Sequence, residues 1–188
     1  IAYDGPAAGL LSVAKSRDRI VVIDGMAKSF AMTGWRIGWA IANTAVTKAL
    51  VAFQSHTTSN ATTVAQYAAL EALRQRAEAE SAIATMVNEY RRRRDAALEV
   101  LRTPDGPRVV DPDGAFYLFI DVQDTNPGND DAGSVFAAKL LEEFGVAVVP
   151  GAAFRTPGWI RLSYAAALES VVEGVKRIVK LREEMTGH

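Results

Sequence analysis

At residues 20–39 the chain reads IVVIDGMAKSFAMTGWRIGW. The apolar run from Ile20 to Ile23 predicts a short strand buried on both faces, as in a parallel sheet. Lys28 follows this run among glycines and hydroxyls, and Arg36 comes eight residues later. A lysine amine can form a Schiff base with an aldehyde, and an arginine can hold a phosphate through paired hydrogen bonds. Together the two side chains indicate a cofactor that carries both groups.

Pyridoxal 5'-phosphate is such a cofactor, and the stretch resembles the cofactor-lysine motif of class I/II aminotransferases. These are aspartate aminotransferase-like enzymes with fold type I of the pyridoxal-phosphate enzymes. The resemblance implies that Lys28 forms the Schiff base and is the general base that moves the substrate's α-proton. It also implies that Arg36 binds the cofactor phosphate and that Gly34 and Gly38 allow close backbone approach. A solvated loop lysine and a surface arginine are the alternatives, and the spacing of the two residues argues against them.

A second motif lies near the end of the chain, where residues 158–165 read GWIRLSYA. It resembles the family's strand whose arginine grips the substrate α-carboxylate, which implies that Arg161 binds the substrate. The sequence VPGAAF at 149–154 matches the family's "PG..F" element, although Arg155 stands where the family commonly has glycine. The sequence PDGAFY at 112–117 matches a strand that lies near the substrate. A solvated edge-strand arginine is the alternative interpretation.

A weaker similarity concerns residues 54–60, QSHTTSN. They resemble a segment that crosses the interface of family dimers towards the neighbouring subunit's cofactor phosphate. The resemblance therefore implies a homodimer in which Thr58 or Ser59 binds that phosphate. Helix capping by Ser59 or Asn60 is an equally good interpretation and does not exclude the first.

The amino-acid composition limits the partners and the kinds of site that the chain can have. The 188 residues have a net charge of −1, which favours neither nucleic acid nor an anionic membrane as a partner. The chain has no cysteine and two histidines, so disulfides and thiolate chemistry are excluded and no metal site is expected. Arg91 to Arg94 spread around a helix at about 100° per residue, which indicates a solvated face with local ion pairs. No apolar run is long enough to span a bilayer, and a cytoplasmic protein is expected.

The pattern of elements predicts an α/β chain in two parts. Residues 1–85 are expected to form the C-terminal part of the large cofactor-binding domain, as a remnant of its parallel sheet. Residues 86–188 are expected to form a small C-terminal α+β domain, joined by a long helix at about 77–102. Asn43 or Thr44 is predicted to cap the start of one helix, and Asn60 is predicted to cap the start of the next. Gly145 is predicted to end the helix over 134–144.

The matched motifs belong to the C-terminal half of such an enzyme. The resemblance implies amino-group transfer between an amino acid and a 2-oxo acid in the complete enzyme. The family's acid beside the pyridine nitrogen normally precedes this region, so the 188-residue chain alone is expected to be inactive or nearly so, with apolar faces left uncovered. Two alternatives share these motifs: a pyridoxal-phosphate-dependent carbon–sulfur β-lyase, and the non-enzymatic cofactor-sensing domain of a transcription regulator.

Overall fold

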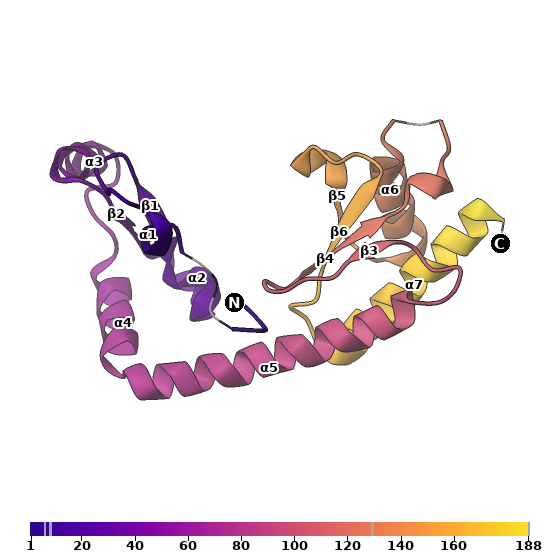
Figure 1. Cartoon of the computed structure of the whole chain (residues 1–188), viewed down its shortest axis with the longest axis horizontal. Helices are drawn as coiled ribbons and strands as arrows, with labels where there is room; N and C mark the ends of the chain where they lie inside the picture. Colours follow the sequence, from indigo (N-terminus) through magenta and orange to yellow (C-terminus); the bar gives the residue numbers. More distant parts are fainter. Residues whose placement is uncertain (6, 8, 129, 188) are drawn as a thin grey trace. The chain divides into compact units, whose positions relative to one another are not determined.

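The computed structural model describes residues 1–5, 7, 9–128 and 130–187 (Figure 1). The chain divides into two compact units, Ile1–Met86 and Val87–His188, and the boundary falls within the long helix α5 (Arg76–Leu101). The long helix expected over residues 77–102 is therefore confirmed. That the units correspond to a large and a small domain stays a prediction.

The first unit contains a two-stranded antiparallel sheet and short and long helices. Its elements are α1 (Leu10–Val13), β1 (Val22–Gly25), α2 (Met26–Ser29), the 3-10 turn η1 (Thr33–Trp35), β2 (Gly38–Ile41), α3 (Thr44–Thr57), α4 (Thr63–Arg74) and the start of α5. The sheet pairs Val22 with Ile41 and Gly25 with Gly38. This hairpin-like pair carries the Lys28 motif between its two strands.

The prediction of a strand at Ile20–Ile23 that is buried in a parallel sheet is wrong in its details. The strand starts at Val22, its partner runs antiparallel, and Ile23 is 81% exposed. The apolar residues suit a covered strand, but Val21 and Ile23 are exposed, and Ile20 and Val22 are only half-buried.

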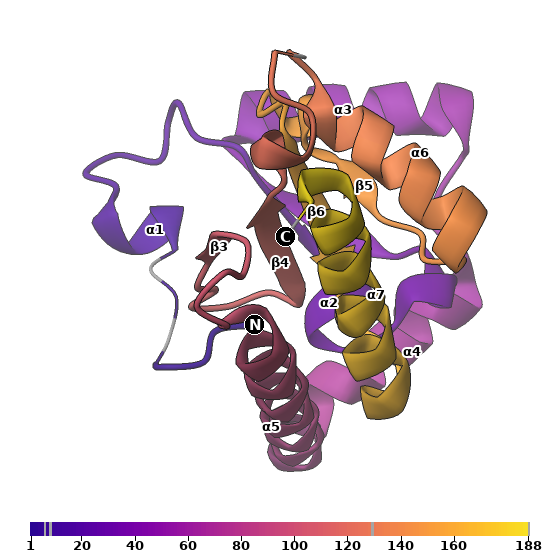
Figure 2. The same cartoon turned by 90° about the vertical axis from the view of Figure 1, so that its right-hand side faces the viewer.

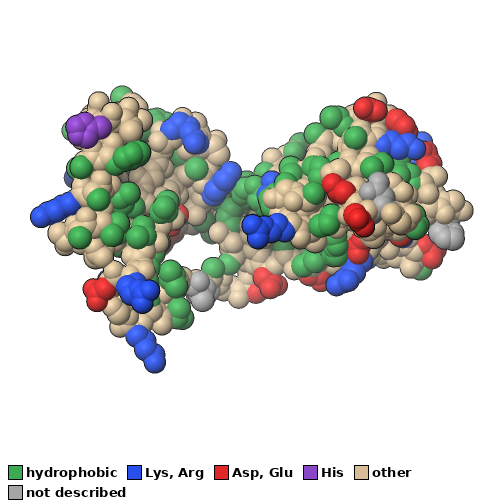
Figure 3. Space-filling view, turned by 90° about the horizontal axis from the view of Figure 1, so that it is seen from above, with side chains coloured by type: hydrophobic (Ala, Val, Ile, Leu, Met, Phe, Trp, Pro, Cys, Tyr) green, Lys and Arg blue, Asp and Glu red, His purple; other side chains and the backbone are tan. Residues whose placement is uncertain are grey.

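Large apolar side chains are exposed across the first unit. They include Leu10, Val13, Val21, Ile23, Trp35, Trp39, Ile41, Leu50, Val51, Phe53, Val64, Tyr67, Leu70 and Leu73. Figure 3 shows hydrophobic side chains over much of the visible surface. The expectation of uncovered apolar faces is confirmed for this unit.

The helix starts in this unit have different causes. Asn43 caps α3 as predicted, because its Oδ1 accepts a hydrogen bond from the Val46 N–H at 3.0 Å. Asn60 does not cap a helix, since α4 begins at Thr63. Ser59 has a φ of 65°, and the Asn60 N–H bonds back to the Thr58 carbonyl at 2.8 Å. The left-handed residue thus makes a turn where a helix start was expected.

The second unit is an α+β structure, as predicted, with a four-stranded antiparallel sheet in the order β3-β4-β6-β5. Its elements are the end of α5, β3 (Val109–Val110), β4 (Tyr117–Asp121), η2 (Gln123–Thr125), α6 (Ala132–Phe144), β5 (Val149–Pro150), η3 (Gly151–Phe154), β6 (Trp159–Ser163) and α7 (Leu168–Thr186). Gly145 ends α6 in the left-handed conformation at φ 65°, which confirms the predicted stop.

The two faces of this sheet differ in burial. Leu118, Ile120, Ile160 and Leu162 alternate along β4 and β6 and are buried, on the face where α6 and α7 pack (Figure 2). Helix α7 contributes Val171, Val175, Ile178 and Leu181 to the core. The opposite face is only partly covered and carries Tyr117, Phe119, Trp159 and Arg161. This second face presents the predicted substrate arginine.

Candidate cofactor and substrate sites

Lys28 lies in the four-residue helix α2, directly after β1. The side chain of Met26, two residues earlier, is fully buried and anchors this short helix. Two helical residues span about 200°, so Lys28 leaves the helix on nearly the opposite side and is exposed. Further backbone bonds hold the segment, from Ala31 N–H to the Lys28 carbonyl at 3.1 Å and from Met32 N–H to the Met26 carbonyl at 3.2 Å. The segment thus presents an amine from a fixed backbone.

Two paired glycines, Gly25 and Gly38, let β1 and β2 approach closely where the lysine segment begins and ends. We call this glycine pair the neck of the segment. A Cβ on Gly25 would lie 2.9 Å from the Ile37 carbonyl oxygen, and one on Gly38 would lie 2.6 Å from the Asp24 carbonyl oxygen. The close approach predicted for Gly38 is thus made to β1 within the chain itself. At Gly34 a Cβ would meet no described atom within 4 Å, so its approach to a cofactor stays a prediction.

Arg36 follows η1 on the same loop as Lys28. Its backbone is left-handed at φ 52°, and its Nη1 donates to the Thr33 carbonyl oxygen at 2.9 Å. The side chain is exposed and keeps a permanent positive charge. The structure therefore brings Lys28 and Arg36 into one loop that the β1–β2 pair closes.

Left-handed backbone marks every sequence motif described above. Among the described residues, five non-glycine residues have positive φ: Ala31 at 54°, Arg36 at 52°, Ser59 at 65°, Ala115 at 59° and Arg155 at 57°. Each lies in or next to a motif that was singled out for cofactor or substrate binding. Such conformations persist only where the surroundings impose them, and they concentrate at functional sites. Their distribution favours a functional role for the segments in each of the two units.

Thr58 and Ser59 lie in the turn that follows α3, in the same unit as Lys28. Both are exposed, and the Thr58 N–H donates to the Gln54 carbonyl at 2.9 Å. Because their expected ligand is the cofactor of a second subunit, their role stays a prediction.

Arg161 lies on β6, on the partly covered face of the second unit's sheet. Its guanidinium carbon is 4.4 Å from the centroid of the Tyr117 ring and 4.3 Å from that of the Phe154 ring. Tyr117 belongs to β4 and Phe154 to η3 after β5, so the two rings come from opposite sides of β6. Sequence reasoning found Arg161 but missed this contact pair. The alternation of Tyr117, Phe119 and Arg161 on one face was the signal available for the β4 ring.

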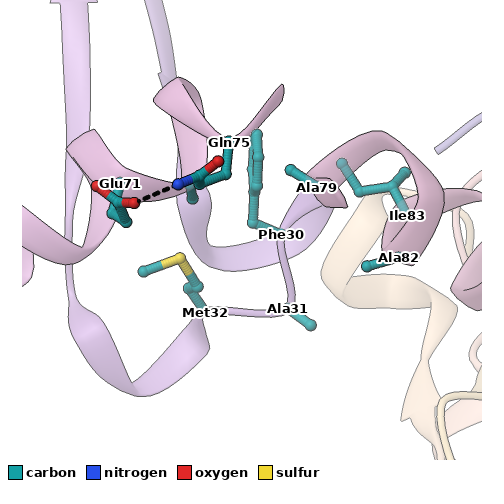
Figure 4. A pocket seen from close by; sticks show the side chains of 9 residues that line it. Phe30, Ala31, Met32, Glu71, Gln75, Ala79, Ala82 and Ile83 are labelled. Carbon is teal, nitrogen blue, oxygen red and sulfur yellow. Dashed lines mark hydrogen bonds between the residues drawn. The ribbon is translucent and has the colours of Figure 1, made fainter. Parts of the chain in front are cut away.

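A separate apolar cavity of about 330 Å³ lies beside the residues that follow the lysine segment, within the first unit (Figure 4). It is lined by Phe30, Ala31 and Met32 together with residues of α4 and α5, among them Ala79, Ala82 and Ile83. At its rim the Gln75 Nε2 donates to the Glu71 Oε1 at 2.8 Å. Neither Lys28 nor Arg36 lines it, so it is distinct from the predicted cofactor site.

Within residues 1–5, 7, 9–128 and 130–187, no three His, Cys, Asp or Glu side chains are grouped so that they could hold a metal ion. In that same part of the chain, no helix combines the length and apolar character needed to cross a bilayer.

Comparison with known proteins identifies the family. The family model for aminotransferases of class I and II matches residues 1–178. The chain belongs to this family. The fold also agrees: an aromatic aminotransferase structure from Pyrococcus horikoshii has a TM-score of 0.88 at 35% identity, over 97% of this chain and 48% of that one. The predicted partial fold type I is therefore confirmed.

Two curated relatives of this chain are close in sequence. The aspartate aminotransferase of Thermotoga maritima is 43% identical over 178 residues, which is 95% of this chain and 44% of the relative. A probable aspartate/prephenate aminotransferase of Aquifex aeolicus is 44% identical over 165 residues, or 87% and 41% of the two chains. The chain thus spans less than half the length of these relatives. The assignment of this stretch to the C-terminal half stays a prediction from the order of the motifs.

The residues present fit pyridoxal phosphate. The β1–β2 loop supplies one amine, from Lys28, and one permanent cation, from Arg36. The Lys28 amine can form a Schiff base with the aldehyde of this cofactor, and the Arg36 guanidinium can bind its phosphate. The left-handed Arg36 lies on a loop whose neck is fixed by two close-packed glycines.

Proposed function

We propose that this chain carries the cofactor lysine and the substrate arginine of a pyridoxal-phosphate-dependent aminotransferase. The reaction moves an amino group between an amino acid and a 2-oxo acid. The observation that supports it most is the single closed loop that holds both Lys28 and Arg36, in a chain that belongs to the class I and II family.

Each of the three side chains has a defined task in this proposal. Lys28 would hold the cofactor through its amine and, once the incoming substrate amine has displaced it, would take the proton from the substrate's Cα as a general base. Arg36 binds the cofactor phosphate with paired, charge-assisted hydrogen bonds. Arg161 binds the substrate α-carboxylate and so orients the Cα–H bond for proton removal. When bound, the cofactor supplies an electron sink for the carbanion that this removal creates.

Amino transfer is favoured over the β-lyase and the regulator because the similar proteins are named as aminotransferases. A cytoplasmic homodimer, with Thr58 or Ser59 reaching the partner's cofactor phosphate, is part of the same proposal. Substrates of the aspartate type fit the names of the two curated relatives, while the Pyrococcus structure is named for aromatic substrates.

Borohydride trapping tests the cofactor site directly. The purified chain is titrated with pyridoxal phosphate, followed by absorbance, reduced with borohydride and mapped by peptide mass spectrometry. We expect a visible imine band and a label confined to the peptide that contains Lys28. Labels scattered over several exposed lysines, with none preferred, would contradict the proposal.

Two matched variants sharpen this experiment. Lys28→Arg keeps the charge and should lose the band, whereas Lys48→Arg changes an exposed lysine of α3 and should retain it. Arg36→Lys should raise the pyridoxal phosphate concentration needed for the band, since a lysine cannot bond a phosphate bidentately. The same variant should leave labelling by pyridoxal unchanged, because pyridoxal has no phosphate.

A further inference from the structure

The Arg161 guanidinium is in contact with two aromatic rings. Its central carbon lies over Tyr117 at 4.4 Å and over Phe154 at 4.3 Å. The rings reach it from β4 and from η3, which flank β6 on either side. Guanidinium groups commonly stack on aromatic faces, and stacking leaves their five in-plane N–H donors available.

Both rings are themselves held in place by other aromatic residues. The Phe154 ring meets Phe119 edge-on, with centroids 6.4 Å apart and planes at 81°. Phe119 lies directly opposite Arg161 in the sheet and stacks on Trp159 at 5.1 Å. Aromatic pairs in these arrangements are favourable beyond the area they bury. The Phe154 ring is therefore supported by a second aromatic residue, which is in turn stacked on a third.

The Tyr117 ring is supported in the same way from the other end. It lies 4.5 Å from the Phe116 ring, which in turn is 5.5 Å from Tyr90 on α5. The aromatic series thus runs without a break on both sides of the cation. Phe116, which lies in the PDGAFY stretch, contributes to this support.

We propose that Phe154 and Tyr117 are positioning residues that hold Arg161 ready for edge-on binding of the substrate carboxylate. This proposal rests on the proposed function. Arginine has a long side chain that loses much rotamer freedom when it binds. Rings that fix the guanidinium before the carboxylate arrives remove part of that cost, and they exclude water from its faces. We call these two rings, Tyr117 and Phe154, the clamp. The clamp therefore raises the affinity of Arg161 for the carboxylate and enforces a planar, bidentate contact.

The clamp itself can be observed by NMR on the 188-residue chain. Ring currents should move the Arg161 Nε–H proton upfield, and Arg161→Lys assigns this signal by removing it. Phe154→Leu and Tyr117→Leu should each return the proton toward its ordinary position, whereas Phe154→Tyr and Tyr117→Phe should retain the shift. Phe144→Leu, which removes the ring beneath Lys180 at 5.5 Å, is the matched control and should change nothing at Arg161.

Titration with 2-oxoglutarate then measures what the clamp does. We expect the Arg161 signal to respond in the wild type, and about tenfold weaker binding in Phe154→Leu or Tyr117→Leu, because an arginine that is not held beforehand loses its rotamer freedom on binding. The ring-retaining variants and Phe144→Leu should bind as the wild type does.

Failures of the two proposals are distinguishable. An Arg161 proton at its ordinary position in the wild type overturns the clamp, whatever the titration gives. A shifted proton with equal binding in all variants overturns the positioning role and leaves the proposed function intact. A shifted proton that does not respond to 2-oxoglutarate overturns the substrate role of Arg161, and the positioning role with it.

Discussion

No side chain larger than hydrogen fits on the Cα of Gly38, because a Cβ there would lie 2.6 Å from the carbonyl oxygen of Asp24. Gly38 pairs with Gly25 in the last register position of the β1–β2 pair, directly before the lysine segment. The backbone contact at this neck therefore controls how the strands close the loop that holds Lys28 and Arg36.

The substitution Gly38→Ala should loosen this neck. Forcing a methyl group against fixed backbone costs roughly 1–3 kcal/mol, and the strands must separate to make room for it. We expect the denaturation midpoint reported by the Trp39 indole N–H to fall, while the Trp159 signal of the second unit keeps its midpoint. Gly34→Ala is the control for stability, since nothing lies within 4 Å of its added Cβ. An unchanged Trp39 midpoint in Gly38→Ala would contradict the role of the neck.

Asn43 joins two parts of the first unit through one side chain. Its Nδ2 donates to the Asp18 carbonyl oxygen at 2.7 Å, and its Oδ1 accepts from the Val46 N–H at 3.0 Å. Asn43→Ala removes both bonds and should lower the free energy of unfolding of this unit by about 1–2 kcal/mol. Asn43→Asp keeps the helix cap and loses only the donor, so it should lie between wild type and Asn43→Ala. Urea denaturation followed at Trp39 measures the series, and equal losses in both variants would show that the cap contributes nothing.

Several of these features follow from local sequence and were predicted. The long helix α5 and the stop of α6 at Gly145 depend on apolar periodicity and on a residue that tolerates positive φ. The cap at Asn43 depends on a side chain only three residues from its partner. Lys28, Arg36 and Arg161 were singled out because their motifs resemble those of a known family, and their roles stay predictions.

The incorrect predictions concern distant or unusual contacts. Asn60 was expected to start a helix, but the left-handed Ser59 before it turns the chain, and local propensity does not reveal this. The clamp around Arg161 depends on strand order and on the path of η3, which bring residues 117 and 154 to the same side chain. The burial of β1 could not be judged from its own apolar residues, because burial depends on the layers that surround a strand.

Arg92 and Arg93 form ion pairs with Glu89, and Arg94 forms one with Asp95, so the predicted local ion pairs are confirmed for these three arginines. Hydrogen bonds from Arg92 and from Arg93 lower the pKa of the Glu89 carboxyl to about 2, from an ordinary value of 4.5. A carboxyl whose pKa is lower in the folded state stabilises that state above the unfolded pKa. Its contribution should therefore be present above about pH 5 and disappear as the pH falls from 4.5 to about 2.

The comparison of wild type with Glu89→Gln across pH measures this contribution. The stability difference between the two should be constant from pH 7 to pH 5 and should shrink steadily below that. Arg92→Gln removes the larger cause, so the carboxyl carbon of Glu89 should titrate closer to 4.5 in an NMR experiment. A difference that does not vary between pH 7 and pH 2 would mean that the ion pairs do not form in solution.

Arg155 occupies a backbone conformation that suits glycine, at φ 57°, directly after Phe154. Its N–H donates to the Ala152 carbonyl oxygen at 3.0 Å, and the Thr156 N–H donates to that of Gly151 at the same distance, so the turn is fixed. A left-handed conformation costs an L-residue about 1–2 kcal/mol, and glycine loses about 0.5–1 kcal/mol more chain entropy on folding. Arg155→Gly should therefore stabilise the second unit by roughly 0.5–1 kcal/mol.

Denaturation followed at Trp159 measures this gain, and Arg155→Ala separates its two possible causes. Alanine removes the charge and the long side chain but keeps the Cβ, so it should give no gain if backbone strain is the cause. Should alanine stabilise the unit as much as glycine does, the side chain of Arg155 would be the source instead. In that case the left-handed turn that carries Phe154 would be unstrained, and η3 would hold the ring beside Arg161 without cost to the fold.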